Sequence, residues 1–152
     1  MLARTWTIPS SSRSLVDYYL GRWDYKQKDV ESLIEKIWKG YYTCIAHLNE
    51  ILKTVDKDQN LFQNGNYELI KGEALGLRAF IHFDLIRLWG PMPTGIDGNR
   101  DYLPYVTTVQ LENYPYSNYQ EYMAKLCADL DSAELLLQRV DLIVANDKSV
   151  SY

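Results

Sequence analysis

The segment from Tyr67 to Trp89 limits what this chain can fold into more than any other part of the sequence. Apolar residues occupy most of its helical circumference, and a helix with little polar face is normally buried. Gly72 and Gly76 lie one turn apart, and each costs about 1 kcal/mol relative to alanine inside a helix. We expect close approach of a neighbouring helix, the preceding one, to offset that cost, and Gly90-Pro91 to end the helix.

Two further segments have the apolar periodicity of an amphipathic helix. The earlier one runs from about Val30 to Val55, with Asp29 as its expected N-cap. The later one follows residues 117–120, whose S-x-x-Q pattern is that of a capping box. Its expected inward face is Tyr119, Met123, Leu126, Leu130, Ala133 and Leu137. The sequence contains no convincing pair of strands, so it predicts an all-α fold.

The pattern divides the chain of 152 residues into three parts. Residues 1–28 form an irregular segment with a short helix near Ser14 to Leu20. Residues 29–140 form one helical domain, and a chain of this size buries roughly 70% of the surface that its unfolded form exposes. Residues 141–152 form a polar tail.

Composition excludes several classes of protein. A net charge of −4 and a pI near 5.1 argue against a nucleic-acid reader, which usually carries a basic patch. No apolar run approaches the roughly 18 residues that cross a bilayer, and the first residues have no apolar core of a signal peptide. Cys44 and Cys127 make neither a disulfide framework nor a zinc pair, and we expect both to be small buried residues.

Three motifs follow one another along the predicted helices. The first has the spacing W-x-x-x-Y-x-x-I-x-x-x-N and consists of Trp38, Tyr42, Ile45 and Asn49. The second consists of Gly72-Glu73-Ala74, Arg78-Ala79-Phe80, Asp84-Leu85 and a stop at Gly90 to Pro93. The third consists of Asp129-Leu130, Ala133 and Leu136. In this combination and order, over about residues 30 to 140, the chain resembles the SusD/RagB family.

The resemblance implies tetratricopeptide-like helical hairpins stacked as an α-α superhelix. Members of that family are surface lipoproteins of Bacteroidetes that capture glycans or other nutrients at the outer membrane and act as a lid on a TonB-dependent transporter. Family members are several times longer and the next family helix is missing, so the chain is expected to be a fragment, a truncated gene product or a divergent short relative. It has no lipoprotein signal or lipid-attachment cysteine, so membrane attachment would require an anchor absent from this chain.

Charged residues in the Tyr67–Trp89 helix have a structural explanation. A buried charge is costly unless it is paired, so we expect Arg78 and Arg87 to bond acids or carbonyls and lock the hairpins, with Asp84 nearby. Glu73 is one acid that could form an ion pair with one of these arginines, although the sequence does not assign the pair. Ligand contact is the less favoured alternative.

Catalysis and metal binding have little support in the sequence. His47 and His82 lack the spacing of a metal site, which needs three or four converging ligands, and helix packing explains them better. Asp129 and Asp131 would point about 200° apart on a helix, so they do not form a carboxylate pair. Because no nucleophile, P-loop or dinucleotide motif is present, we predict no enzymatic activity, no metal and no cofactor.

Aromatic residues in irregular segments are the candidates for ligand contact. Aromatic faces stack on the C–H face of a sugar ring, and five such residues are Trp6, Trp23, Tyr25, Tyr102 and Tyr105. The alternative is that these rings fold back over the helices. The predicted function is non-catalytic binding of a glycan or other nutrient with a transporter as partner. The competing hypothesis is a stand-alone helical adaptor that binds a protein.

Overall fold

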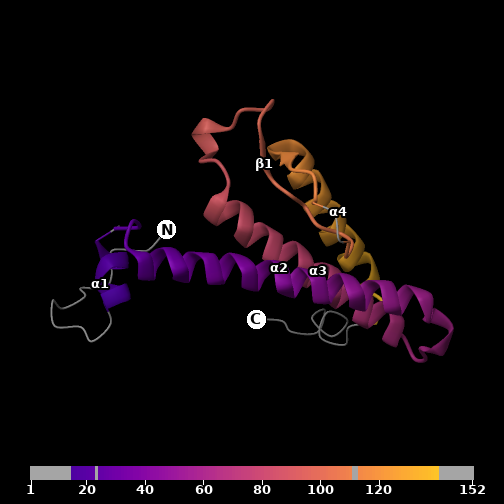
Figure 1. Cartoon of the computed structure of the whole chain (residues 1–152). Helices are drawn as coiled ribbons and strands as arrows, with labels where there is room; N and C mark the ends of the chain where they lie inside the picture. The colour runs from indigo at the N-terminus through magenta and orange to yellow at the C-terminus, as the bar shows by residue number, and fades with distance from the viewer. Residues whose placement is uncertain (1–14, 23, 111–112, 141–152) are drawn as a thin grey trace, which may run out of the picture. The chain divides into compact units, whose positions relative to one another are not determined.

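The computed structural model describes residues 15–22, 24–110 and 113–140. In these ranges the helices are α1 (Leu15–Gly21), α2 (Lys28–Lys57), α3 (Asn66–Trp89) and α4 (Tyr119–Leu137), with the 3-10 turns η1 (Gln59–Leu61) and η2 (Pro93–Gly95) (Figure 1). The predicted all-α fold is confirmed, since each of the three long helices lies where the apolar periodicity placed it. One short antiparallel pair, β1 (Asp101–Leu103) with β2 (Ser117–Asn118), was not predicted, because elements of two and three residues are too short to display alternation.

The chain divides into two compact units, and the division falls within α2 between Gly40 and Tyr41. In the first unit, Arg22 donates to the hydroxyl of Tyr18 at 2.8 Å, and its guanidinium lies over the same ring at 5.4 Å from the ring centroid. Trp38 is half-buried in this unit. The predicted boundary at residue 28 stays a prediction.

In the second unit, the later part of α2 and α3 form an antiparallel hairpin. Asn64 and Gly65 turn the chain with backbone φ angles of 58° and 79°, the left-handed conformation that asparagine and glycine tolerate best. Contacts then progress in opposite directions along the two helices, from Lys71–Asp56 at 2.6 Å to Arg78–Asn49 at 2.7 Å. Between them lies an apolar core of Leu52, Ala74, Leu75 and Ala133, with Leu48 and Leu136 packed against it.

The helix that approaches α3 most closely is α4, not α2. Figure 1 shows α3 and α4 side by side, joined by the long connection that carries β1. A Cβ atom at Gly72 would lie 2.7 Å from Cγ of Leu137, and one at Gly76 would lie 3.8 Å from Cβ of Ala133. The prediction that these glycines admit the preceding helix was therefore wrong. The spacing of small residues identified a contact face but not the helix that uses it.

The surface of α3 is less buried than its composition predicted. On one side Ala74, Ala79, Leu85 and Ile86 are buried, whereas on the other Leu77, Phe80, Phe83 and Leu88 are exposed. The apolar residues around most of the circumference of α3 predicted that the whole helix is buried, and that prediction was wrong. Among the described residues, α2 and α4 cover the faces that are buried, and the remaining apolar face is open.

The start of α4 and the two cysteines also differ from expectation. Asn118 is the N-cap, because its Oδ1 atom accepts from the backbone N–H of Glu121 at 2.9 Å. Ser117, the predicted cap, instead lies buried in β2 and contacts Nζ of Lys125 at 3.2 Å. Cys44 and Cys127 are exposed rather than buried. Each is adjacent in sequence to a buried residue, and adjacent residues lie about 100° apart around a helix.

Candidate functional site

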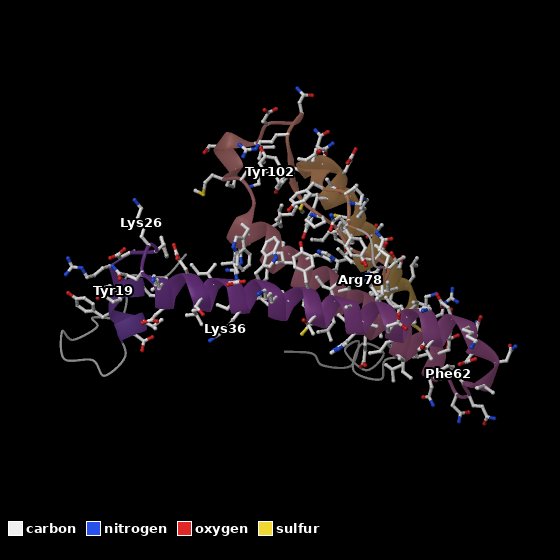
Figure 2. The ribbon with its side chains drawn as sticks, viewed as in Figure 1. Tyr19, Lys26, Lys36, Phe62, Arg78 and Tyr102 are labelled. Atoms are coloured by element: carbon white, nitrogen blue, oxygen red, sulfur yellow. The ribbon has the colours of Figure 1, made fainter. Side chains whose placement is uncertain are left out.

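Arg78 is the centre of a buried polar network in the second unit, and it is labelled in Figure 2. Its side chain donates from Nε to Asp129 Oδ2 at 2.8 Å and from Nη2 to Oδ1 at 2.7 Å. This fork-to-carboxylate geometry is the strongest form of charged hydrogen bond between side chains. Nη1 donates to Asn49 Oδ1 at 2.7 Å, so Arg78 joins all three long helices.

The expected pairing of Arg78 is confirmed, but its partner is Asp129 rather than Glu73. Glu73 is exposed on α3, whereas Asp129 is buried on α4. Arg87 does not lock the hairpin, because it is 54% exposed and pairs with Asp84 three residues earlier in its own helix. Asp131, the other member of the rejected carboxylate pair, is exposed.

The same network holds residues 104–108 of the connection between α3 and α4, which we term the anchored segment. Asn49 Nδ2 donates to the carbonyls of Val106 at 3.2 Å and Thr108 at 3.4 Å. The hydroxyl of Tyr42 donates to the carbonyl of Pro104 at 3.2 Å. Tyr42 and Asn49, both members of the first sequence motif, therefore donate the hydrogen bonds that these backbone carbonyls would otherwise accept within a sheet.

His82 fixes the middle of the anchored segment. Its ring is fully buried and stacks on the Tyr105 ring with centroids 3.9 Å apart. The hydroxyl of Tyr122 donates to the His82 carbonyl at 2.8 Å, so its oxygen is left to accept from Nδ1 at 2.9 Å. Nε2 then accepts from the backbone N–H of Val106 at 3.3 Å. Burial lowers the pKa of His82 to about 4, which keeps the ring neutral in this arrangement.

Two tyrosine hydroxyls complete the network as donors. Tyr105 donates to Asp129 Oδ2 at 2.6 Å, and burial, followed by that carboxylate, raises the pKa of Tyr105. Burial also raises the pKa of Tyr122. Within the described residues, no buried side-chain nitrogen or oxygen lacks a partner. A fully satisfied polar core specifies one arrangement of its elements, so this network positions the connection rather than offering reactive groups.

A groove of about 440 Å³ opens beside the network. Its lining consists of Asn49, Leu52, Lys53, Asp56, Lys71, Leu75, Arg78 and residues 107–109. Lys71 lies 2.6 Å from Asp56 Oδ1, and the Tyr67 hydroxyl donates to the same oxygen at 2.9 Å. Burial alone would raise the pKa of Asp56, but the hydrogen bonds from Lys71 and Tyr67 lower it. The groove thus combines an apolar floor with a charged rim, and no aromatic ring is among its lining residues.

Among the described aromatic residues predicted to contact ligand, Tyr102 and Tyr105 belong to the second unit and Tyr25 belongs to the first. Tyr105 is only 6% exposed and its face is covered by His82, so the prediction of a free stacking face was wrong there. Tyr102 lies in β1, and its hydroxyl accepts from the backbone N–H of Asp97 at 2.9 Å. Figure 2 shows Tyr102 on the connection, away from Arg78. Tyr25 is exposed and belongs to the first unit. Trp6 and Trp23 lie outside the described residues.

The remaining motif residues shape helix ends and contacts. Asp84 accepts from the hydroxyl of Tyr41 at 3.3 Å as well as from Arg87. Gly90 caps α3, with its N–H donating to the Ile86 carbonyl at 2.8 Å, and a Cβ atom there would collide with that carbonyl. Pro93 begins η2, where a missing N–H is tolerated.

Sequence reasoning missed Tyr122 and Asp129 as members of the inward face of α4. The buried residues of this helix are Tyr122, Leu126, Asp129 and Ala133, which follow helical spacing. An apolar-only pattern overlooks a tyrosine and an aspartate on such a face. Their spacing from Leu126 and Ala133 was the available signal.

No group of three or more His, Cys, Asp or Glu side chains in the described ranges could hold a metal ion. Among the same residues, no helix combines the length and the hydropathy needed to cross a bilayer.

Known protein families provide an independent comparison. A family model described as starch-binding and associating with the outer membrane matches residues 7–146, which is all of the chain except its two ends. No curated protein and no solved structure matches the chain. The match includes the anchored segment and all three sequence motifs.

Proposed function

The chain belongs to the SusD-like family, described as starch-binding and associating with the outer membrane, and from that membership we propose that it binds a glycan or another nutrient without catalysis. The family match over residues 7–146 carries the proposal. Binding takes place at the cell surface, with a TonB-dependent transporter of a Bacteroidetes outer membrane as the partner. A lipid anchor supplies the membrane attachment of such proteins.

The buried network supports a binding role in preference to a catalytic one. Arg78 and Asp129 bond to each other, and His82 bonds to Tyr122 and to Val106 of the anchored segment. Arg78 also lines the groove, but its Nε, Nη1 and Nη2 atoms all donate to acceptors of the protein itself. General acid–base catalysis needs a group within hydrogen-bond reach of a substrate. Here those groups hold the connection in place, as a scaffold for a binding surface requires.

Ligand contact is proposed for the aromatic residues outside the helical core. Tyr25 is an exposed ring of the first unit, and Tyr102 is a half-buried ring of the connection with the Arg100 guanidinium 5.5 Å from its centroid. Trp6 and Trp23 complete the proposed set. Rings of this kind stack on sugars, while neighbouring polar groups bond the hydroxyls.

Native affinity electrophoresis tests the proposal. The purified chain should migrate more slowly in a gel containing soluble starch than in a plain gel, relative to a protein that does not bind starch. Tyr25→Ala should reduce this retardation and leave the far-ultraviolet circular dichroism spectrum unchanged. Tyr116→Ala is the matched control, because it removes another exposed tyrosine outside the proposed set. Equal retardation of Tyr25→Ala and wild type would remove Tyr25 from the site, and no retardation in starch or in any other glycan gel would contradict the function.

A further inference from the structure

The open face of α3 carries an apolar stripe with a charge at each end. The stripe consists of Glu73, Leu77, Phe80, Phe83 and Arg87, and we term it the α3 stripe. Its three apolar members are 50%, 62% and 47% exposed in chain order. Contiguous exposed apolar surface of this kind usually marks a site of interaction with another molecule. The proposed glycan contacts include none of these residues.

The spacing of the α3 stripe is symmetric about Phe80. Leu77 and Phe83 lie three residues before and after it, and Glu73 and Arg87 lie seven residues before and after it. At 1.5 Å of rise per residue, each charge lies roughly 10 Å from Phe80 along the helix. The two ends carry opposite charges. If a second α3 helix runs in the opposite direction, its apolar residues therefore lie opposite the apolar residues of the first, and each Glu73 lies opposite an Arg87.

We propose that the α3 stripe is the contact surface for a second copy of this chain, with the two α3 helices antiparallel and Phe80 at the twofold axis. A twofold contact uses the same surface on both subunits and must be self-complementary. In the antiparallel arrangement, Glu73 of each copy faces Arg87 of the other, and the two pairs are equivalent. A parallel arrangement would place like charges opposite each other.

One detail of α3 suits this contact. Arg87 already bonds Asp84 through Nε and Nη2, which holds the guanidinium in one orientation and leaves Nη1 outside that pair. A charge fixed in this way loses less side-chain freedom when a second carboxylate approaches.

The size of the stripe predicts a weak dimer. An aromatic side chain buries about 150–250 Å² when fully covered. At the observed exposure the stripe offers roughly 400 Å² per copy, so two copies bury roughly 800 Å² in total, which is below the roughly 1,200 Å² at which stable interfaces begin. We therefore expect association in the micromolar range, visible at tens to hundreds of micromolar protein.

Sedimentation equilibrium of the full chain across that concentration range tests the proposal. Wild type should show a monomer–dimer equilibrium, and Phe80→Glu should abolish the dimer. Leu135→Glu is the matched control, because Leu135 on α4 is 63% exposed and lies outside the stripe; it should dimerise like wild type. Circular dichroism and thermal melting establish that each variant is folded.

Charge reversal tests the antiparallel register separately. Glu73→Arg and Arg87→Glu should each weaken the dimer about tenfold, because each places two like-charged pairs across the axis. The double variant restores opposite charges and should recover most of the wild-type affinity. A chain that stays monomeric, or one that forms open-ended aggregates, would overturn the proposal and assign the face to another molecule. A dimer that Phe80→Glu leaves intact, or whose single reversals are not rescued by the double variant, would overturn it as well.

Discussion

Replacing Asp129 by alanine should destabilise the protein more than any other single truncation of a polar side chain in the network. Asp129 accepts three hydrogen bonds, from Arg78 Nε at 2.8 Å, Arg78 Nη2 at 2.7 Å and the Tyr105 hydroxyl at 2.6 Å. The two charged side chains are only 8% and 12% exposed. Alanine would leave a buried guanidinium with two unpaired N–H groups and a buried hydroxyl without an acceptor. Removing one partner of a buried ion pair typically costs about 3–5 kcal/mol.

Urea unfolding followed by circular dichroism measures this effect. Stability of a domain is typically about 5–15 kcal/mol, and with a slope of about 1–3 kcal/mol per molar urea the midpoint should fall by roughly 2 M. Glu35→Ala is the control, because it breaks the Lys39–Glu35 pair, whose side chains are 71% and 63% exposed, and exposed ion pairs contribute little to stability. A loss below about 1 kcal/mol for Asp129→Ala would refute the claim that this network holds the helices together.

Three further outcomes can be measured in the same way. Gly76→Ala should stabilise the chain by up to about 1 kcal/mol through helix propensity. Gly72→Ala should be less stable than Gly76→Ala, because its Cβ atom would lie 2.7 Å from Leu137. Equal stability of the two variants would contradict the contact assigned between Gly72 and α4. Asn118→Ala should cost about 1 kcal/mol through loss of the N-cap of α4, and an unchanged urea midpoint would argue against that cap. The pKa of His82 is near 4 in the folded chain and about 6.5 in the unfolded chain, so the unfolded chain binds the proton first as the pH falls. Stability should therefore fall by about 2 kcal/mol between pH 7 and pH 5, and His82→Gln should flatten that dependence. A wild-type free energy of unfolding that does not change over this range would count against a neutral buried ring.

The positions of the long helices could be predicted because they depend on local pattern. Apolar periodicity located α2, α3 and α4, and Gly90 marked the end of α3. Helix partners could not be predicted in the same way. Gly72 and Gly76 had the spacing of a contact face, but which helix meets that face depends on how the connection after α3 returns the chain.

The candidate site depends on contacts that are distant in sequence. Arg78 and Asp129 are separated by 51 positions, and nothing local distinguishes Asp129 from the exposed Asp131 except helical phase. Tyr105 was assigned to an open loop because its segment has no periodicity. The segment is held instead by side chains of Asn49 and His82, which bond to its backbone. A loop fixed by side chains leaves no repeating pattern in its own sequence.

The apolar face of α3 shows where composition alone misleads. Phe80 belongs to the same motif as Arg78, yet Arg78 is buried and Phe80 is exposed. Two residues apart on a helix, they point about 200° away from each other. Hydrophobicity measures the tendency of a residue to be buried, whereas the neighbours actually present decide which face is covered.

A glycan array, combined with an assay for released reducing ends, tests the function most directly. We predict that the purified chain binds at least one class of glycan, starch among the first candidates, and that the bound glycan remains intact on prolonged incubation. Absence of binding to every glycan on the array would contradict the assignment of a nutrient-binding role. Release of reducing ends in proportion to protein concentration would contradict its non-catalytic character.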